Sequence, residues 1–292
     1  MPVRNARRLV VIYNPTAGWR RRRRLDRVLA RLEALGCEVT LSETRAKGDA
    51  EAFARHVDAG AHDAVVAAGG DGTINEVANG LADRGLPLGI VPLGTANVLA
   101  AELGLSSDPA AIADAIAFGT PCAVYPGRAN GRLFLMMAGI GFDARVVEGV
   151  DLRLKRRIGK GAYVASALVA MARHRNGGYA LEIDGVAATA AGAIIAKGHF
   201  YGGRFVVASA ADLAQPVLQV VLFKSGGRVD VVRYAVALAA GRLGALADVR
   251  VVPAHEVRIA GPAGETVQLD GDLAGTLPFE ASVAARPIAL LR

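Results

Sequence analysis

Cysteine is scarce in this sequence of 292 residues. Only Cys37 and Cys122 occur, and they form no CxxC pair. A disulfide framework or a structural zinc site needs several cysteines at short, regular spacing. The sequence therefore argues against both, and we expect a protein of the reducing cytoplasm.

Long uncharged apolar runs are lacking as well. A membrane-spanning helix needs about 20 consecutive apolar residues, whereas the longest candidates, 163–172 and 235–241, have the length of helices in a protein core. The first residues, MPVRNARRLVVIYNP, contain no apolar segment of the kind found in secretory signals. We expect a soluble or peripheral protein without a transmembrane helix.

Aromatic residues make up only 5% of the sequence, although 52% of it is hydrophobic and 21% is charged. We expect cores of small aliphatic residues, and the length is sufficient for two domains. The net charge of +7 predicts attraction to polyanions, which include nucleotide phosphates, nucleic acids and anionic membrane surfaces. Charge alone does not distinguish among these partners.

Strand-like and helix-like segments alternate in the N-terminal part of the chain. We expect strands at 8–14, 38–41, 63–68 and 88–91, and helices at 22–35, 49–59, 73–82 and 95–103. This order predicts an α/β domain whose parallel sheet is covered by helices on both faces. We assign residues 1–121 to this domain.

The pattern changes from residue 122 to short strand-like segments separated by Gly, Asp-Gly and Pro. They cover 122–126, 132–138, 180–184, 190–197, 217–223, 250–252, 256–260 and 266–269, with helical segments at 159–174 and 228–246. Such a pattern is typical of an antiparallel, β-rich domain. We assign residues 122–286 to this second domain and expect 287–292 to return to the first domain as a strand.

The strongest local motif is AAGGDGTINE, at Ala67–Glu76. A buried strand leads into Gly69, Gly70, Asp71 and Gly72, and a helix follows. The glycines allow φ values closed to other residues, and amides of the turn and the helix N-terminus can point at phosphate oxygens. The Asp71 carboxylate could hold Mg²⁺ or accept a proton. The alternative is an ordinary turn in which Asp71 caps the helix.

Two further polar turns follow other expected strands. They are Asn14–Gly18 (NPTAG) and Pro92–Asn97 (PLGTAN), and Thr44 follows the second strand. The carboxyl ends of parallel strands share one edge of a sheet, and ligands bind there. Independent capping turns would not need this joint arrangement. The sequence therefore predicts one phosphate-binding site at this edge.

These motifs, in this order and spacing, closely resemble those of the bacterial diacylglycerol-kinase-like lipid kinases, whose relatives include sphingosine and ceramide kinases. The resemblance continues at Gly139–Ala144 (GIGFDA), at Lys155–Tyr163 (KRRIGKGAY) and at Leu269–Asp272 (LDGD), which stands where the family has Asp-Gly-Glu. It covers nearly the whole chain. The resemblance implies an α/β nucleotide-binding domain of the NAD-kinase and diacylglycerol-kinase type, followed by a β-sandwich domain.

The resemblance also implies an activity, the ATP-dependent phosphorylation of a hydroxyl of a lipid such as diacylglycerol, with Mg²⁺. It implies that Thr44, Gly69 through Asn75, and Thr95 bind ATP. It further implies that Asp272 is the general base for the hydroxyl proton, with Asp270 as the alternative. Together with the three turns, the candidate nucleotide-binding residues are Asn14, Pro15, Gly18, Thr44, Gly69, Gly70, Asp71, Gly72, Thr73, Ile74, Asn75, Glu76, Gly94, Thr95 and Asn97. The candidate catalytic residues are Asp272, Asp71 and Asp270, and the candidate metal ligands are Asp71 and Asp212.

Three departures from the family pattern affect these expectations. Asp272 replaces Glu, which shortens the base by one methylene, and a change in reach of about 1 Å is costly. The segment 97–101 (NVLAA) lacks the Asp and the Arg of the family's GTxNDFAR motif, as the sphingosine-kinase branch lacks that Asp, so the acceptor stays open. Gln215-Pro216 stands where relatives carry an Asp-Gly linked to a structural Mg²⁺, and Asp212 lies near it.

A basic run, Arg20–Arg24, follows Trp19. It is either the solvated start of the first helix or an interfacial anchor for anionic headgroups. A second basic surface could come from Arg153, Lys155, Arg156, Arg157 and Lys160. We therefore include an anionic membrane surface among the expected partners, beside ATP and the lipid substrate, with peripheral association from the cytoplasm.

Other functions remain open. They are a sphingoid-base or ceramide kinase, an NAD kinase-like enzyme, and a nucleotide-binding or membrane-binding homologue with impaired catalysis. NAD kinases share GGDGT, but NPTAG and PLGTAN favour the lipid branch. Nucleic acid is not an expected partner, because the arginine run lacks interleaved aromatic residues and no nucleic-acid motif is present. The oligomeric state is open, with a homodimer as one option.

Overall fold

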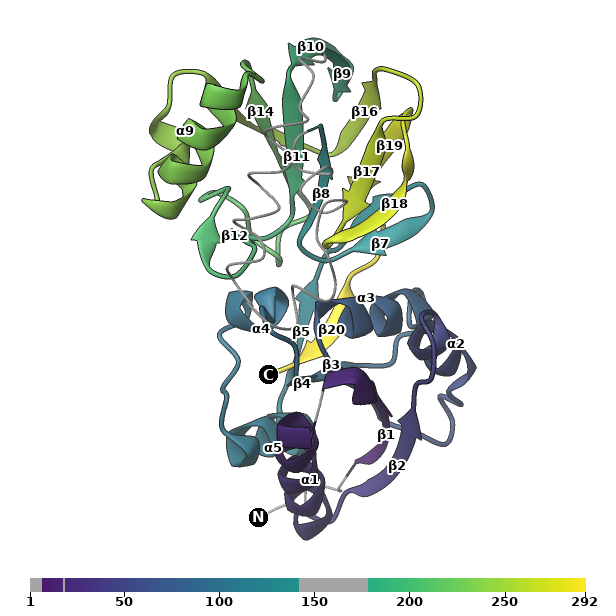
Figure 1. The fold of residues 1–292 in the computed structure, drawn as a ribbon. Helices are drawn as coiled ribbons and strands as arrows, with labels where there is room; N and C mark the ends of the chain where they lie inside the picture. Colours follow the sequence, from purple (N-terminus) through teal and green to yellow (C-terminus); the bar gives the residue numbers. More distant parts are fainter. Residues whose placement is uncertain (1–6, 18, 142–177) are drawn as a thin grey trace. The chain divides into compact units, whose positions relative to one another are not determined.

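The computed structural model describes residues 7–17, 19–141 and 178–292 (Figure 1). The chain forms two compact units. The first comprises Met1–Tyr125 and Ala285–Arg292, and the second comprises Pro126–Ala284. The chain therefore leaves the first unit once and returns to it for its last residues.

A six-stranded sheet forms the centre of the first unit. In the order β2-β1-β3-β4-β20-β5, its strands are Glu38–Glu43, Arg8–Tyr13, Ala64–Gly69, Leu88–Pro92, Ile288–Leu291 and Pro121–Val124. Neighbouring strands are parallel, except for β20 and β5. Every residue of β3 (AVVAAG) is buried, as expected of a parallel strand with both faces covered.

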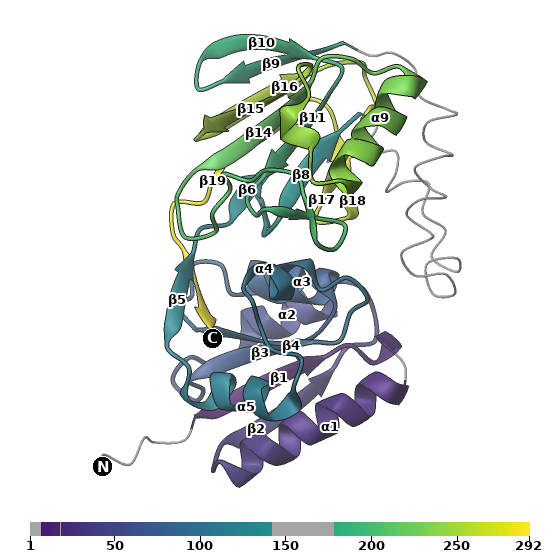
Figure 2. The ribbon, with the colours of Figure 1, turned by 90° about the vertical axis from the view of Figure 1, so that its left-hand side faces the viewer.

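Helices cover both faces of this sheet (Figure 2). They are α1 (Trp19–Ala34), α2 (Asp49–His56), α3 (Asp71–Gly80), α4 (Val98–Glu102) and α5 (Pro109–Phe118). Leu25 and Leu32 of α1 share one core cluster with Ile112 and Ile116 of α5, so these two helices cover the same face. Helices α2 and α3 pack together on the opposite face. The expected α/β domain with a parallel, helix-covered sheet is thus confirmed.

Helix α5 was not expected from the sequence patterns. Its segment, PAAIADAIAF, is rich in alanine, so its apolar periodicity is weak. Its start nevertheless carries two recognisable signals: the Asp108 carboxylate accepts a hydrogen bond from the Ala111 amide at 3.1 Å, and Pro109 is the first helical residue. These capping signals, rather than periodicity, predict the helix.

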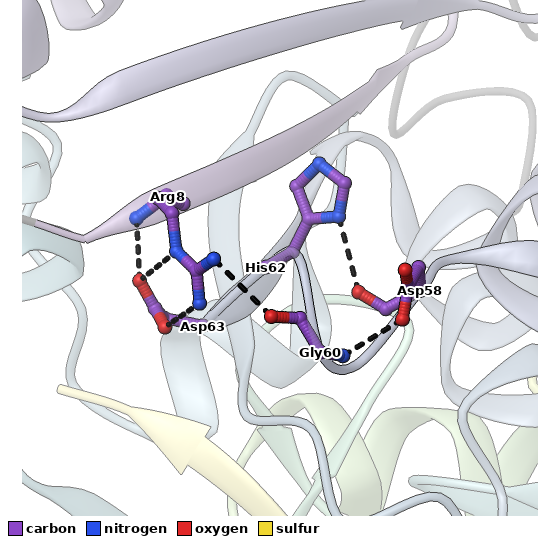
Figure 3. A network of polar contacts seen from close by, with 5 residues as sticks. All are labelled: Arg8, Asp58, Gly60, His62 and Asp63. Carbon is purple, nitrogen blue, oxygen red and sulfur yellow. Dashed lines mark hydrogen bonds and ion pairs between the residues drawn. The ribbon is translucent and has the colours of Figure 1, made fainter.

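A polar network ties the starts of β1 and β3 together (Figure 3). The Arg8 backbone amide and its Nη2 donate to the Asp63 carboxylate at 2.7 and 2.9 Å. The guanidinium also reaches the Gly60 carbonyl at 3.2 Å, and the Gly60 amide donates to the Asp58 carboxylate at 2.8 Å. These hydrogen bonds from Arg8 lower the pKa of Asp63. The network fixes the starts of two strands whose other ends carry predicted phosphate-binding turns.

Two six-stranded antiparallel sheets form the second unit. In the order β10-β9-β16-β19-β6-β7, the strands of one sheet are Val186–Ala190, Tyr179–Ile183, Glu256–Ala260, Phe279–Val283, Gly127–Ala129 and Arg132–Phe134. In the order β15-β14-β11-β8-β17-β18, those of the other are Val249–Ala254, Leu218–Phe223, Gly192–Ala196, Met137–Ile140, Thr266–Leu269 and Asp272–Thr276. One core cluster joins Leu181 and Phe279 of the first sheet to Ile195 and Val220 of the second. The sheets therefore pack face to face, which confirms the β-sandwich.

Two smaller elements belong to the second unit. They are the hairpin of β12 (Phe200–Tyr201) and β13 (Phe205–Val206), and the helix α9 (Arg228–Ala239), which is followed by a 3₁₀ turn at Leu243–Ala245. Among the residues that the structure describes, no helix is both long and apolar enough to cross a membrane.

The expected domain boundaries, after residues 121 and 286, differ from the division that the structure shows. Strand β5 was assigned to the second domain, but it pairs with β20 at the edge of the first unit's sheet. The first unit therefore extends to Tyr125 and resumes at Ala285. The return strand expected at 287–292 is β20.

Several expected elements of the second unit also differ. The helix expected at 228–246 ends at Ala239, and the expected strand 132–138 is divided into β7 and β8. Strands β10 and β18 were missed because most of their residues are exposed, which leaves no clear apolar alternation. The helix expected at 159–174 lies outside the described residues.

Candidate functional site

The predicted turns meet at one edge of the first unit's sheet. The Asn14 amide donates to the Ala68 carbonyl at 3.0 Å, and the Leu93 amide donates to the Gly69 carbonyl at 2.8 Å. The buried Thr44 joins them, since its amide donates to the Tyr13 carbonyl at 2.9 Å. The backbone that follows β1, β2, β3 and β4 is thus hydrogen-bonded into one continuous edge.

The first two turns also contact each other through side chains. Asn14 donates from Nδ2 to the hydroxyl of the buried Thr73 at 3.2 Å, and its Oδ1 accepts from the Thr16 hydroxyl at 2.8 Å. A Cβ at Gly69 would lie 2.5 Å from the Thr73 Cβ, which is closer than real side chains approach. Glycine at this position therefore lets the Thr73 side chain lie against the strand end.

The second and third turns approach each other through glycine. A Cβ at Gly94 would lie 2.6 Å from the Gly70 Cα and 2.6 Å from Asn97 Oδ1. Gly70 has φ of −91°, and no glycine of either turn has a positive φ. The expectation that these glycines supply unusual φ values is therefore wrong: they are needed because two backbones lie in contact.

The Asp71 carboxylate links the same two turns. Its Oδ1 accepts a hydrogen bond from the Leu99 amide at 3.4 Å, at the start of α4. Burial raises the pKa of Asp71, and the amides of Leu99, Val98 and Asn97 act in the opposite direction. Asp71 thus caps a neighbouring helix rather than its own. The second and third turns are fixed relative to each other by this half-buried carboxylate.

Asn97 closes the third turn and leaves one polar atom without a partner. It adopts a left-handed φ of 47°, and its Nδ2 donates to the Gly94 carbonyl at 3.0 Å. Its Oδ1 is buried and has no hydrogen-bond donor among the residues that the structure describes. A buried carbonyl oxygen without a donor is costly. A bound molecule or a water that donates a hydrogen bond here would relieve this cost.

Arg21 lies at the site, although the sequence pattern predicts a different role for it. Its Nη2 donates to the Thr95 hydroxyl at 3.2 Å, so a guanidinium lies beside the third turn. As part of the basic run Arg20–Arg24, it is predicted to belong to a solvated or membrane-facing helix start. The signal that could have identified it is position: the first turns of α1 follow β1 and lie at the same sheet edge as the phosphate-binding turns.

Two further arginines of the run, Arg22 and Arg24, are also engaged within the protein. Arg22 bonds Asp26 at 2.9 Å and Glu43 at 2.5 Å, and it lies over the ring of Tyr13. Arg24 donates to the Ser107 carbonyl, and burial lowers the pKa of its guanidinium. The run is therefore not a uniform, solvent-facing cationic surface.

The remaining candidate nucleotide-binding residues of the first unit have side chains in the core, in contacts with other helix residues, or at the surface. Ile74 is 1% exposed, so its side chain belongs to the core. Asn75 accepts a hydrogen bond from Asn79 at 3.0 Å, and Glu76 accepts one from the Ala50 amide at 3.3 Å, at the start of α2. These three side chains thus make contacts within the first unit, in its core or with neighbouring helix residues. Pro15 is exposed beside Asn14, Gly72 is exposed at the start of α3, and Gly18 lies outside the described residues.

In the second unit, Asp270 and Gly271 form a two-residue turn between β17 and β18. Their φ values of 50° and 85° are those of a type I′ hairpin turn. The Asp270 carboxylate accepts hydrogen bonds from the amides of Leu135, Met136 and Met137 at 2.7, 2.8 and 3.0 Å. Asp270 therefore holds the hairpin against the β7–β8 segment. Its oxygens are used structurally, which argues against it as the general base.

Asp272 lies in a different environment. It is the first residue of β18, pairs with Leu269 across the turn, and is exposed. An exposed carboxylate next to a rigid type I′ turn has a fixed backbone and access to an incoming group. Of the two aspartates, Asp272 is thus the one whose side chain is exposed.

A buried cation, Lys197, lies at the same end of this sheet and was not singled out from the sequence. It follows β11, is fully buried, and donates from Nζ to the Asp212 backbone carbonyl. Its amide donates to the Met136 carbonyl at 2.7 Å, beside the segment that Asp270 holds. A lone lysine at the end of an apolar strand (GAIIAK) was the available signal.

The metal predictions can be compared with this geometry. Among the described residues, no three or more His, Cys, Asp or Glu side chains group together as a metal site. The Asp212 carboxylate accepts a hydrogen bond from the Ala214 amide at 2.8 Å, and Lys197 Nζ donates to the Asp212 backbone carbonyl. The Lys197 ammonium therefore lies at the position where the sequence predicts a metal ligand. Mg²⁺ in phosphotransferases is usually held by one or two carboxylates and by the substrate phosphates. Asp71 fits that requirement as a single carboxylate on the loops.

Of two further segments that resemble family motifs, Gly139–Ala144 and Lys155–Tyr163, the structure describes only part of the first. Gly139 and Ile140 end β8, and Gly141 follows with φ of 75°. Residues 142–144 of that motif and the whole of Lys155–Tyr163 lie outside the described residues, as do the basic residues 153–160.

Comparison with known proteins identifies relatives over the whole chain. Residues 8–128 match the diacylglycerol kinase catalytic domain, and residues 136–292 match the YegS C-terminal NAD kinase beta sandwich-like domain. A diacylglycerol kinase of Bacillus subtilis (strain 168) is 30% identical over 282 residues, which cover 94% of this chain and 92% of that protein. A diacylglycerol kinase of Staphylococcus haemolyticus (strain JCSC1435) is 39% identical over 156 residues, 52% of this chain and 47% of that protein.

A solved structure has the same fold. The crystal structure of a diacylglycerol kinase from Bacillus anthracis str. Sterne superposes with a TM-score of 0.80 over 98% of this chain and 97% of that one, at 22% identity. The matched catalytic domain contains all three turns that meet at the sheet edge, and the matched sandwich contains Asp270 and Asp272. The chain therefore belongs to the bacterial diacylglycerol-kinase-like family.

Proposed function

We propose that this protein is an ATP-dependent lipid kinase that transfers the γ-phosphate of ATP to a hydroxyl of a membrane lipid such as diacylglycerol. The observation that carries the proposal is the junction of the Asn14, Gly69–Thr73 and Gly94–Asn97 turns at one sheet edge. Membership of a kinase family supports ATP and a divalent metal as the cofactors. The names of the relatives support diacylglycerol as the first acceptor to test.

The nucleotide phosphates would lie against the first unit's turns. The first-turn amides of α3 lack intrahelical partners, as in any helix, and favour an anion. The Arg21 guanidinium adds a positive charge beside Thr95, and Mg²⁺, when bound, neutralises phosphate charge next to Asp71. The unpartnered Asn97 Oδ1 would accept a hydrogen bond from the nucleotide or from a water.

Asp272 would supply the general base. The lipid hydroxyl oxygen attacks the γ-phosphorus, its proton passes to the Asp272 carboxylate, and ADP leaves with the electrons of the broken P–O bond. Phosphoryl transfer depends mainly on positioning and charge neutralisation, so a single carboxylate base is sufficient. The exposed position of Asp272 supports this role over the structurally bound Asp270.

The test is incubation of the purified protein with γ-labelled ATP, Mg²⁺ and separate acceptors. Diacylglycerol, a sphingoid base, ceramide and NAD form the four arms, because all four offer a hydroxyl and represent the competing functions. We expect labelled product with diacylglycerol and none with NAD. Label in NAD alone, or ATP binding with no label in any acceptor, would contradict the proposal.

A further inference from the structure

Helix α9 has apolar residues on both of its faces. Val231, Tyr234 and Ala237 face the protein and are buried. Val229, Val232 and Val236 are 80%, 44% and 63% exposed. A soluble helix with one packed face normally carries polar residues on the other, and a helix that is apolar all round is normally buried. Among the residues that the structure describes, none buries the three outer valines of α9.

The exposed valines form one stripe. Their spacing of three and four residues places Val229, Val232 and Val236 on a single side of the helix. The hairpin strand β13 contacts α9 and carries two further exposed apolar side chains, Phe205 (42%) and Val206 (36%). We call these five residues the α9 apolar surface.

Charge around the α9 apolar surface is mainly positive. Exposed arginines lie beside each of its parts: Arg204 next to Phe205, Arg228 at the start of α9, and Arg242 shortly after its end. Arg233 bonds Asp230 at 3.0 Å and also bonds Asp248, so these two aspartates share one arginine. Together with Arg233, the three flanking arginines outnumber the two carboxylates, and the apolar stripe is thus flanked by net positive charge.

We propose that the α9 apolar surface docks the protein on an anionic lipid bilayer, with α9 lying in the plane of the membrane interface. Amphipathic helices of this kind bury an apolar stripe among the acyl chains, while flanking arginines attract anionic headgroups. This deepens the proposed function and rests on it for the choice of partner, because a kinase whose acceptor is a membrane lipid must reach the bilayer.

The size of the surface favours a membrane over a second copy of the chain. A helix of 12 residues is roughly 18 Å long and its side chains span about 10 Å, which is a small area. A stable protein interface covers about 800 Å² on each partner. The α9 apolar surface falls well short of this, whereas an interfacial helix needs only one apolar stripe.

The test is sedimentation of the full-length protein with vesicles of phosphatidylglycerol and phosphatidylcholine, or of phosphatidylcholine alone. We expect binding to the anionic vesicles and a loss of at least about ten-fold in the double variant Val229→Asp/Val236→Asp. The matched control is Val186→Asp. Val186 is 68% exposed and lies on β10, in the sheet of the sandwich that begins with β10 and β9 and does not include the α9 apolar surface. This control should bind as the wild type does.

A second variant tests the charges. The double variant Arg204→Gln/Arg242→Gln should weaken binding to anionic vesicles several-fold and reduce the dependence of that binding on salt. The control is Arg27→Gln, at an exposed position of α1, which should bind as the wild type does. Equal vesicle binding by the wild type and the valine variant would overturn the inference. So would a wild-type dimer that becomes monomeric in that variant while vesicle binding is unchanged.

Phosphotransfer measured in parallel separates this inference from the proposed function. A water-soluble, short-chain diacylglycerol needs no docking, so the valine variant should phosphorylate it at the wild-type rate and lose activity only on vesicles. If the wild type binds anionic vesicles through these valines but phosphorylates no lipid, the docking surface stands and the kinase proposal fails.

Discussion

Asp71 has a structural contact in the fold, and the proposed function gives it a chemical role as well. It is half-buried, it caps α4, and it lies on the turn where phosphates are expected. We predict that Asp71→Asn lowers phosphotransfer by about 100-fold or more, as loss of an essential proton-accepting or metal-binding group does. The fold should persist, since the neutral amide avoids the cost of a buried charge. Thermal unfolding and labelled-ATP assays measure the two effects, and near-normal turnover would contradict the assignment.

The raised pKa of Asp71 makes a further prediction about pH. In the folded protein this carboxyl holds its proton to a higher pH than the usual value of about 3.9. Ionisation therefore lowers folding stability as the pH rises from the unfolded pKa through the folded pKa. The difference in stability between Asp71→Asn and the wild type should grow across that interval and then level off. A difference that does not change with pH would show that the side chain is not desolvated.

The two aspartates of the β17–β18 hairpin should respond differently to the same substitution. Asp272→Asn should reduce the catalytic rate by about 10²–10⁴-fold, typical for a general base, with little change in ATP affinity. Asp272→Glu should retain most activity, because the family motif that the segment LDGD resembles, Asp-Gly-Glu, has Glu at this position. Asp270→Asn should instead destabilise the protein by about 1–3 kcal/mol: Asn keeps one acceptor oxygen for the Met136 and Met137 amides, but its NH2 group would face the Leu135 amide, which loses its acceptor. A stable but inactive Asp270→Asn, with an active Asp272→Asn, would reverse the two roles.

Arg21 tests whether the basic run serves the nucleotide. Arg21→Gln should weaken ATP binding about ten-fold, as expected for loss of one charge-assisted hydrogen bond, and should leave adenosine binding unchanged. Arg27→Gln is the control, because Arg27 is exposed on the same helix and its side chain donates to the Arg23 carbonyl at 3.4 Å, within α1 itself. Calorimetry with ATP and with adenosine measures both. Equal ATP affinity in Arg21→Gln and Arg27→Gln would return Arg21 to a surface role.

At the scale of elements, the two glycine turns act as one unit. Gly94→Ala forces a methyl group against Gly70, so we expect the second and third turns to separate and ATP affinity to fall about ten-fold or more. Gly244→Ala is a matched control, since the space around Gly244 is open and its φ is not positive. Retained ATP binding in Gly94→Ala would show that the contact does not shape the site.

The sequence predicted elements well where burial is continuous. Strands β1, β3 and β4 are buried almost throughout, so their apolar runs were recognisable, and their order predicted the parallel sheet. Strands β10 and β18 are mostly exposed and carry little pattern. Helix α5 was missed because alanine gives weak periodicity, although Asp108 and Pro109 mark its start.

For the site, the sequence predicted which turns meet but not how they are held together. The shared sheet edge follows from parallel topology, so Asn14, Gly69 and Gly94 could be grouped in advance. That Asp71 would cap α4, or that Arg21 would reach Thr95, depends on side-chain directions between elements far apart in sequence. Periodicity contains no such information. The distinct roles of Asp270 and Asp272 likewise became clear only from the amides around the hairpin.

At the scale of the whole molecule, the first unit carries the edge proposed to bind the nucleotide, and the second carries the Asp272 carboxylate and the α9 apolar surface. Family membership supports the kinase activity, and the α9 apolar surface supports a membrane as the source of the acceptor. The central claim is that phosphate moves from ATP to a lipid hydroxyl through these residues.

The most direct measurement is single-turnover transfer of label from γ-labelled ATP to diacylglycerol in mixed micelles, with the wild type, Asp71→Asn and Asp272→Asn side by side. The account predicts labelled phosphatidic acid from the wild type, a loss of about 100-fold or more in each variant, and ATP binding preserved in Asp272→Asn. Equal product from all three proteins, or no labelled lipid from a wild type that binds ATP, would contradict it.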